Sequence, residues 1–346
     1  MKFIKMSLLV LMCTLFIIGY SNTQYNKNIS NTSTKNGSNE ILYGKYPEPL
    51  VKAIGENIDV NKNYKELTKD DLKKVRNFYF EREMDENYPD KNYGFQDGKK
   101  YDFSILLEMP NLTALYVNLG ENIKLEDYSI LKKLSKLERL TVGNVNNDDI
   151  ESIVGLTSLK WFVICNSKDI TNIEFLNDMK QLTFFGLDNV PNVHDYQPLN
   201  NLTNVEHVNL TNSGLTEKDV NSFPDMDAIE TLSLYNNKIV SLNNFPEMKN
   251  LQSLLLSNNP LTEINILSGK TPSLKVLLLD NTKISDLNKL SGVNNIESIT
   301  LRNTGVKRIS PLKEYKNLKE INIDANNVED LDMFKGSSVI IGEIEG

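Results

Sequence analysis

The sequence predicts a curved α/β solenoid, in which short repeats stack so that each one contacts only its neighbours. The first observation behind this fold is a unit of 22 to 25 residues that recurs ten times between Asn111 and Phe334. The second is an apolar residue that leads each unit: Leu112, Leu137, Leu159, Leu182, Val205, Ile229, Leu251, Leu274, Ile296 and Leu318. The third is an Asn seven places after the lead residue in eight units: Asn144, Asn166, Asn189, Asn212, Asn236, Asn258, Asn281 and Asn303.

The repeat pattern is L-x-x-L-x-L-x-N-N/T-x-I/L, and it is clearest in the units led by Leu251 and Leu274. This is the signature of a leucine-rich repeat. Each unit should add one strand to a parallel sheet on the concave face and a short helix or turn to the convex face. We therefore expect ten leucine-rich repeats over residues 111–335, followed by a C-terminal cap over residues 336–346 in which Val339–Ile341 closes the last repeat.

The first 21 residues are typical of a signal peptide. Lys2 and Lys5 precede an uncharged, mostly apolar stretch of 14 residues, and small residues stand at Gly19 and Ser21. The apolar stretch is shorter than the roughly 20 residues that a membrane-spanning helix needs. We expect a secreted or extracellular protein, with possible association with the cell surface. A membrane would be involved only if this segment stays uncleaved or is lipidated at Cys13, for which the flanking residues match poorly.

Residues 22–40 are rich in Asn, Ser and Thr, so we expect a disordered spacer. An N-terminal cap should follow over residues 41–110, because the first repeat would otherwise expose an apolar face. It should contain a helix over 46–54, a second helix that begins at Thr68 with Asp71 in a capping box, and a strand around Phe78 and Phe80. An insertion over residues 81–101 carries Tyr88, Tyr93, Phe95 and Tyr101. It reads as a solvated loop, or as part of a binding face.

The cap and the repeats together resemble the internalins and related surface proteins of Gram-positive bacteria. The resemblance covers residues 41–346 and rests on Pro47-Glu-Pro-Leu50, on Leu67-Thr-Lys-Asp-Asp-Leu72 and on the 22-residue repeats. It implies a non-enzymatic protein that holds a protein ligand on its concave face. The chain has no recognisable immunoglobulin-like domain and no L-P-x-T-G motif, so we expect a short, freely secreted member rather than one linked to the cell wall.

Strand alternation assigns the side chains to the two faces of the sheet. Positions three and five after the lead residue should point into the core, and positions two, four and six should point outward. Eleven strands, counting the cap, would give an outward surface on the order of 50 Å long. Its predicted partner-binding residues are Tyr79, Tyr116, Trp161, Val163, Phe184, His207, Tyr235, Leu255, Val276 and Leu278.

Two of these residues, Trp161 and Phe184, occupy the same position in successive repeats, so we expect them side by side and facing solvent. Exposed aromatic clusters mark interaction sites, which predicts a protein ligand. Acidic residues along one edge (Glu81, Asp188 and Asp280) favour a partner with basic groups. The identity of that partner, from a host or from the bacterial envelope, is left open.

Polar residues just after the strands have a structural interpretation. Their amides and hydroxyls should bond backbone groups of the turns that otherwise lack partners. These residues are Asn237, Asn259, Thr282, Thr304 and Asn326. Cys165, at the sixth position of its repeat, reads as a small edge residue rather than as a partner in an intermolecular disulfide.

Other classes of function find little support in the sequence. The formal net charge of −8 would become about −10 after signal cleavage, and acidity argues against nucleic acid. His207, Asp188 and Ser233 share the outward face without a nucleophile-elbow signature, and no phosphate-binding loop or metal motif is recognisable. We expect no enzymatic activity, no cofactor, no metal and a monomer. Two alternatives stay open: an intracellular repeat scaffold like those that bind phosphatases, and a self-associating envelope protein.

Overall fold

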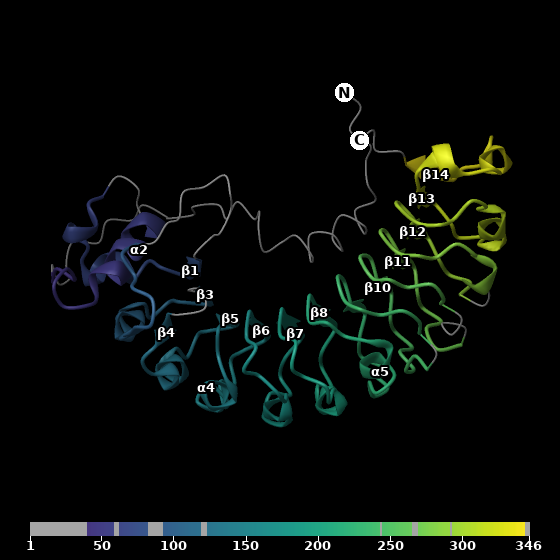
Figure 1. Ribbon diagram of the computed structural model, residues 1–346. Coiled ribbons are helices and arrows are strands. Elements are labelled where there is room, and N and C mark those ends of the chain that lie inside the picture. The colour runs from purple at the N-terminus through teal and green to yellow at the C-terminus, as the bar shows by residue number, and fades with distance from the viewer. Residues whose placement is uncertain are drawn as a thin grey trace. The chain divides into compact units, whose positions relative to one another are not determined.

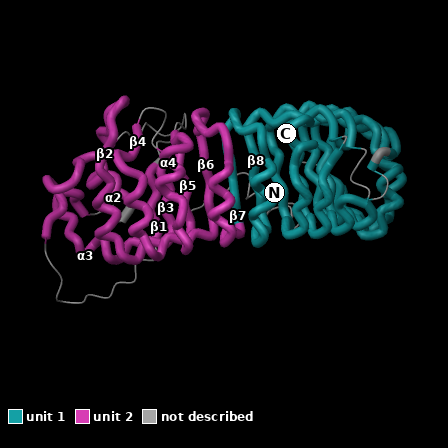
Figure 2. Tube along the Cα trace, turned by 90° about the horizontal axis from the view of Figure 1, so that it is seen from below, with its two compact units in different colours: residues 1–24, 184–346 teal, residues 25–183 magenta. Residues whose placement is uncertain are grey.

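The computed structural model describes residues 40–58, 62–81, 93–118, 123–242, 244–264, 269–290 and 293–342. The described chain divides into an N-terminal unit, residues 40–183, and a C-terminal unit, residues 184–342 (Figure 2). The predicted signal peptide, Cys13, nearly all of the predicted spacer and Tyr88 of the insertion lie outside the described residues.

The N-terminal unit holds a helical segment followed by repeats. Its helices, including the short 3-10 helices η, are α2 (Glu48–Ile58), η1 (Tyr64–Glu66), α3 (Lys69–Leu72), η2 (Ser104–Glu108), η3 (Tyr128–Lys133), α4 (Asn147–Glu151) and η4 (Glu174–Asp178). Its strands are β1 (Asn77–Glu81), β2 (Lys100–Tyr101), β3 (Ala114–Asn118), β4 (Lys124–Leu125), β5 (Arg139–Gly143) and β6 (Trp161–Cys165).

The start of α3 follows the predicted capping arrangement. The Asp71 carboxylate accepts hydrogen bonds from the backbone N–H of Thr68 at 2.9 Å and from its hydroxyl at 2.8 Å. These bonds fix the first turn of a helix that is too short to be stable by itself. The strand that follows, β1, buries Phe78 and Phe80 completely, as its alternation predicts.

Part of the insertion packs onto this core instead of being solvated. Phe95 is buried, with its ring centroid 6.3 Å from that of Phe80 and 4.9 Å from that of Tyr101. Strand β2, at the end of the insertion, pairs in parallel with β4 to form a small separate sheet. The interpretation of residues 81–101 as a merely solvated loop is therefore wrong for Phe95 and Tyr101.

Parallel pairing joins the repeats of the N-terminal unit. Strand β1 pairs with β3, β3 with β5, and β5 with β6, each shifted by one repeat in sequence. The register places the same repeat position of neighbouring units side by side. Tyr79 lies opposite Tyr116, and Arg139 lies opposite Trp161.

The C-terminal unit continues the pattern with eight parallel strands. They are β7 (Phe184–Asp188), β8 (His207–Thr211), β9 (Thr231–Ser233), β10 (Ser253–Leu255), β11 (Val276–Leu278), β12 (Ser298–Thr300), β13 (Glu320–Asn322) and β14 (Ile340–Gly342). Its helices are η5 (Gln197–Asn201), α5 (Glu217–Val220), η6 (Asn288–Leu290), η7 (Ser310–Glu314), η8 (Ala325–Asn327) and η9 (Leu331–Phe334). Within this unit the strands line one side and the short helices the other (Figure 1).

These elements confirm the leucine-rich repeat solenoid. The inward positions three and five after the lead residue are buried, for example Leu254 and Leu256 or Ile321 and Ile323. The last strand, β14, pairs with β13 and so continues the sheet past the final repeat, as predicted for Val339–Ile341.

The Asn residues at the seventh repeat position have one common conformation. All eight have positive φ, between 47° and 60°, and no other described residue except Gly does. Asn tolerates this left-handed conformation better than other residues with a Cβ, which explains its recurrence at the turn that ends each strand. In the last repeat the seventh position is Ala325, and the chain forms η8 there instead.

Four of the five polar residues predicted to bond the turns do so. The Asn237 amide nitrogen donates to the carbonyls of Leu210 and Leu234 at 2.7 and 3.0 Å, and Asn259 repeats this arrangement one unit later. The hydroxyls of Thr282 and Thr304 donate to the carbonyls three residues before them, at 2.8 and 2.7 Å. Asn326 differs, because it is exposed and lies in η8.

Candidate partner-binding surface

The outward face of each sheet carries the side chains that alternate with those of the core. Positions two and four after the lead residue lie within the strands, and position six lies at their carboxyl ends. Among the predicted binding residues, Tyr79, Trp161, His207 and Tyr235 are half-buried, whereas the others are buried. The buried set is Tyr116, Val163, Phe184, Leu255, Val276 and Leu278. Their role in partner binding stays a prediction.

In the N-terminal unit the aromatic side chains occur next to one another or next to a cation. The rings of Tyr79 and Tyr116 lie 6.2 Å apart at an angle of 32°. The Arg139 guanidinium carbon lies 5.6 Å from the centre of the Trp161 ring, within the range of a cation–π interaction. This contact holds the indole of the chain's single Trp against the sheet, so that Trp161 is half-buried rather than fully exposed.

In the C-terminal unit the strand positions of β7, β8 and β9 form a patch around Asn209. Phe184 lies opposite His207 with ring centroids 6.3 Å apart. Asn209 lies between Gly186 and Ser233 in the same register. Burial lowers the pKa of His207 below its ordinary value, while Glu206 and Glu230 oppose the shift. The imidazole is therefore favoured in its neutral form.

Tyr235 and three aliphatic residues continue this face. The Tyr235 hydroxyl accepts a hydrogen bond from the amide nitrogen of Asn258 in the next repeat, which fixes the ring at the carboxyl end of its strand. Leu255 lies opposite Leu278, and Val276 lies opposite Ser253. Trp161 and Phe184 belong to different units, so their predicted adjacency stays a prediction.

Two of the three acidic edge residues can be compared directly. Asp280 accepts hydrogen bonds from the backbone N, Nε and Nη2 of Arg302 at 2.8, 3.0 and 2.5 Å. Asp188, at the same repeat position, accepts from the Thr211 hydroxyl at 3.3 Å and from the Asn212 amide at 2.5 Å. Burial raises the pKa of the Asp188 carboxyl, and these two neutral donors only partly oppose the shift.

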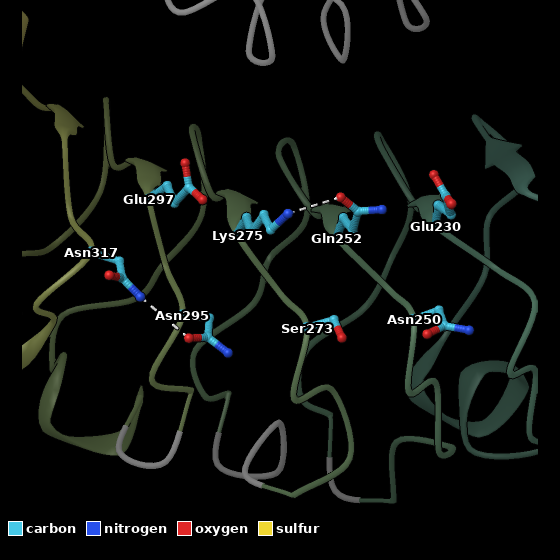
Figure 3. Close-up of a pocket in the computed structure, with 8 residues that line it drawn as sticks. All are labelled: Glu230, Asn250, Gln252, Ser273, Lys275, Asn295, Glu297 and Asn317. Atoms are coloured by element: carbon cyan, nitrogen blue, oxygen red, sulfur yellow. Dashed lines mark hydrogen bonds between the residues drawn. The ribbon is translucent and has the colours of Figure 1, made fainter.

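A polar depression of about 440 Å³ follows the opposite ends of the strands in the C-terminal unit (Figure 3). Its lining comes from the positions just before and just after the lead residue: Glu230, Asn250, Gln252, Ser273, Lys275, Asn295, Glu297 and Asn317. Lys275 donates to the Gln252 side chain at 3.2 Å, and Asn317 donates to Asn295 at 3.3 Å. The depression has no signal in the sequence, because single polar residues beside the lead position are also typical of ordinary solvated positions.

The residues that could suggest hydrolytic chemistry do not converge. The register sets His207 opposite Phe184 and Asp188 opposite Thr211, four residues further along the strands. At about 3.3 Å per residue, the backbone positions of His207 and Asp188 are separated by about 13 Å along the strand direction, too far for a catalytic hydrogen bond. Within the described ranges no group of three or more His, Cys, Asp or Glu residues is placed to hold a metal ion.

Cys165 is buried at the carboxyl end of β6, and its carbonyl accepts the Ser167 hydroxyl at 2.7 Å. In the part of the chain that the structure describes, no helix has the length and apolar character needed to cross a membrane. Arg139 was not among the predicted binding residues. Its repeat position is the signal that could have placed it beside Trp161, because both residues occupy the second position of successive repeats.

Comparisons with known proteins agree with the fold. The family model described as "Leucine rich repeat" matches residues 203–261. None of the curated proteins matches the sequence. Among solved structures the chain is similar to the internalin InlF of Listeria monocytogenes, with 17% identity and a TM-score of 0.52 over 90% of this chain and 100% of that one.

Two other solved structures have lower TM-scores. An internalin C2 of Listeria monocytogenes is 20% identical with a TM-score of 0.43, over 74% of this chain and 94% of that one. A leucine-rich repeat protein of Leptospira interrogans is 18% identical with a TM-score of 0.47, over 80% of this chain and 75% of that one. The likeness to InlF supports an internalin-like leucine-rich repeat fold.

Proposed function

We propose that this internalin-like leucine-rich repeat protein is a secreted or cell-surface, non-enzymatic scaffold that binds a protein partner. The outward face of its strands is the binding surface, and adhesion to a host cell is one such role. The observation that carries the proposal is the occurrence of half-buried aromatic side chains on that face in each unit, Tyr79 and Trp161 in the N-terminal unit and His207 and Tyr235 in the C-terminal unit. Such side chains are the usual anchors of protein interfaces.

The strands make this surface suitable for recognition. Parallel pairing and the buried turn bonds fix the backbone before any ligand arrives, so little conformational entropy is lost on binding. Large aromatic side chains with one polar atom, such as Tyr and Trp, then gain contact area at a small further entropic cost. A few anchors can therefore dominate the affinity.

The site of action is proposed from the N-terminal sequence. Lys2 and Lys5, the apolar stretch and the small residues before position 22 are typical of an exported chain. Fractionation of the producing cells, with mass spectrometry of the N-terminus, tests this part. A full-length cytosolic species would contradict secretion and would favour the intracellular scaffold.

The binding proposal is tested by a pull-down with residues 22–346, from host-cell surface extract and from the envelope of the producing cell. Trp161→Ala should weaken the free energy of binding to a partner by about 2 kcal/mol or more, because a half-buried aromatic anchor is lost, and the captured amount should fall accordingly. Thr231→Ala, at the same repeat position but without a ring, is the matched control. Phe184→Ala is less suitable, because Phe184 is buried and its truncation would also leave a cavity.

A partner recovered equally by Trp161→Ala and by the unchanged protein would contradict the anchor role of Trp161. Sedimentation at several protein concentrations separates partner binding from self-association. A concentration-dependent oligomer that Trp161→Ala dissolves would turn the proposal into one about an envelope assembly of identical chains.

A further inference from the structure

Asp280 and Arg302 form an ion pair at the carboxyl ends of two neighbouring strands. Both residues stand six places after the lead residue, in successive repeats, and so lie side by side at the carboxyl ends of the strands. The guanidinium donates to one carboxylate oxygen through Nε at 3.0 Å and through Nη2 at 2.5 Å. A carboxylate at the sixth repeat position, at the carboxyl end of its strand, can therefore bind a guanidinium from the next strand.

Asp188 occupies the equivalent position in an earlier repeat, but its neighbour is Thr211. Its carboxylate accepts hydrogen bonds only from neutral groups, the Thr211 hydroxyl and the Asn212 amide. Within the described residues no Lys, Arg or His forms an ion pair with it. A half-buried carboxylate without a cation is costly, because desolvation is compensated only in part.

Two more acceptors on the neighbouring strands face the same patch. Asn209 is 7% exposed and Ser233 is 4% exposed. The Asn209 Oδ1 and Ser233 Oγ atoms have no hydrogen-bond partner among the described residues. Asn209 is the diagonal neighbour of Asp188, and next to it on β7 stands Gly186, which contributes no side chain. The patch therefore holds two buried oxygen acceptors whose hydrogen-bonding capacity is unused by the described residues, next to a half-buried carboxylate.

We propose that Asp188 receives an arginine side chain of the protein partner, in the manner in which Asp280 holds Arg302. The proposal rests on the proposed function, and it adds the chemistry that the partner must supply. An Arg has five donors in a planar group, which suits a carboxylate flanked by further acceptors better than a Lys does. The net charge of −8 favours approach of such a basic partner.

The experiment uses a small probe, N-acetylarginine amide, and nuclear magnetic resonance of Asn side-chain amides. The Asn212 amide, which donates to Asp188, is the reporter. The Asn303 amide, which donates to Asn281 at 2.8 Å beside the filled Asp280 site, is the matched control. The arginine probe should shift the Asn212 signal in a saturable way and leave Asn303 unchanged. N-acetylcitrulline amide, which has the same shape without the charge, should shift neither.

Variants assign the effect to the carboxylate. Asp188→Asn should weaken probe binding at least tenfold, whereas Asp280→Asn should leave it unchanged. Thr211→Arg would place a guanidinium beside Asp188, as Arg302 stands beside Asp280. It should therefore occupy the site and abolish the probe-dependent shift. Because Thr211→Arg supplies a cation that the site lacks, it should also keep or raise the thermal stability.

The proposal would be overturned by no saturable shift of Asn212 up to the solubility limit of the probe, by an equal shift with citrulline, or by binding that survives Asp188→Asn. Equal binding of N-acetyllysine amide would also overturn it, by showing a general cation site. These outcomes are separate from the fate of the proposed function. If Trp161→Ala abolishes partner binding but Asp188→Asn does not change it, the proposed scaffold function would stand and the arginine proposal would be wrong.

Discussion

The side chain of Asn237 bonds the backbone of Ser213 in the preceding repeat. Its Oδ1 accepts the N–H of Ser213 at 3.0 Å and that of Leu215 at 3.1 Å, while Nδ2 donates to the Leu210 carbonyl at 2.7 Å. One buried amide thus satisfies three backbone groups of a neighbouring turn. Asn237 and the equivalent polar residues just after the strands are therefore part of the core of the solenoid and not of its surface.

Removal of this amide should be costly. Asn237→Ala leaves several buried backbone groups without partners, and we expect the free energy of unfolding to fall by about 2–4 kcal/mol. Asn326→Ala, in the exposed turn of the last repeat, should change it by no more than about 0.5 kcal/mol. Urea unfolding followed by circular dichroism measures both. Equal losses would show that the bonds of Asn237 contribute nothing specific.

Two buried tyrosines should respond in opposite directions to loss of their hydroxyl. The Tyr196 hydroxyl is buried without a hydrogen-bond partner among the described residues, so Tyr196→Phe should stabilise the fold by about 1 kcal/mol. The Tyr315 hydroxyl donates to the Leu290 carbonyl at 2.6 Å, so Tyr315→Phe should destabilise it by about 1 kcal/mol. Thermal melting of the two variants is the test, and a loss on Tyr196→Phe would contradict the assignment of its hydroxyl.

At the Asn positions with a left-handed backbone, Gly should be more stable than Ala, which reverses the usual ranking of these two residues. At Asn166, where φ is 47°, Ala should be less stable than Gly by about 1 kcal/mol, because a Cβ is disfavoured in this conformation. At Lys313, in the 3-10 helix η7, Ala should be at least as stable as Gly. Comparison of the two variants at each position removes the contribution of the original side chain. A shared ranking at both positions would argue against strain at Asn166.

His207 should make stability fall on acidification. Its pKa in the folded state is lowered below the ordinary value near 6.5, so the unfolded chain binds the proton more readily. Stability is unaffected above that value, decreases as the pH falls below it, and levels off below the folded-state pKa. His207→Gln should flatten the profile between pH 7.5 and 5. The control is His194→Gln, whose imidazole lies against Asp219 outside the patch.

Asp188 acts in the opposite direction at lower pH. Its raised pKa means that the folded state binds a proton before the unfolded chain does, so protonation of this one carboxyl stabilises the fold. The contribution of His207 is therefore best read from the upper part of that pH range, where the carboxyl groups stay ionised. Asp188→Asn in the His207→Gln background separates the two contributions.

Periodicity accounts for most of what the sequence predicts correctly. The lead residues and the inward positions recur in all ten units, and the left-handed Asn recurs in eight of them, so each assignment is supported by many copies. The same reasoning finds β1 from Phe78 and Phe80, because alternation marks a strand even outside the repeats. The register of parallel strands then follows from the repeat length.

The remaining features depend on contacts that do not repeat. Phe95 packs under the insertion because Phe80 and Tyr101 happen to surround it, and nothing in its local sequence distinguishes it from Tyr93. The exposure of outward residues also depends on neighbours, so Leu255 and Val276 are buried although they alternate with the core. The pairing of Asp280 with Arg302, and its absence at Asp188, needed the register and the side-chain geometry together.

The turn bonds have a consequence for how such a chain can change its length. Besides their local bonds, Asn237 and Asn259 make bonds that join residues 20 to 27 positions apart, close to one repeat. Deletion or duplication of a complete unit would recreate the same bonds at the new junction, whereas gain or loss of one strand residue would invert the faces of that strand. Evolution can therefore extend or shorten the recognition surface only in whole units, and each step adds or removes an intact row of contact positions.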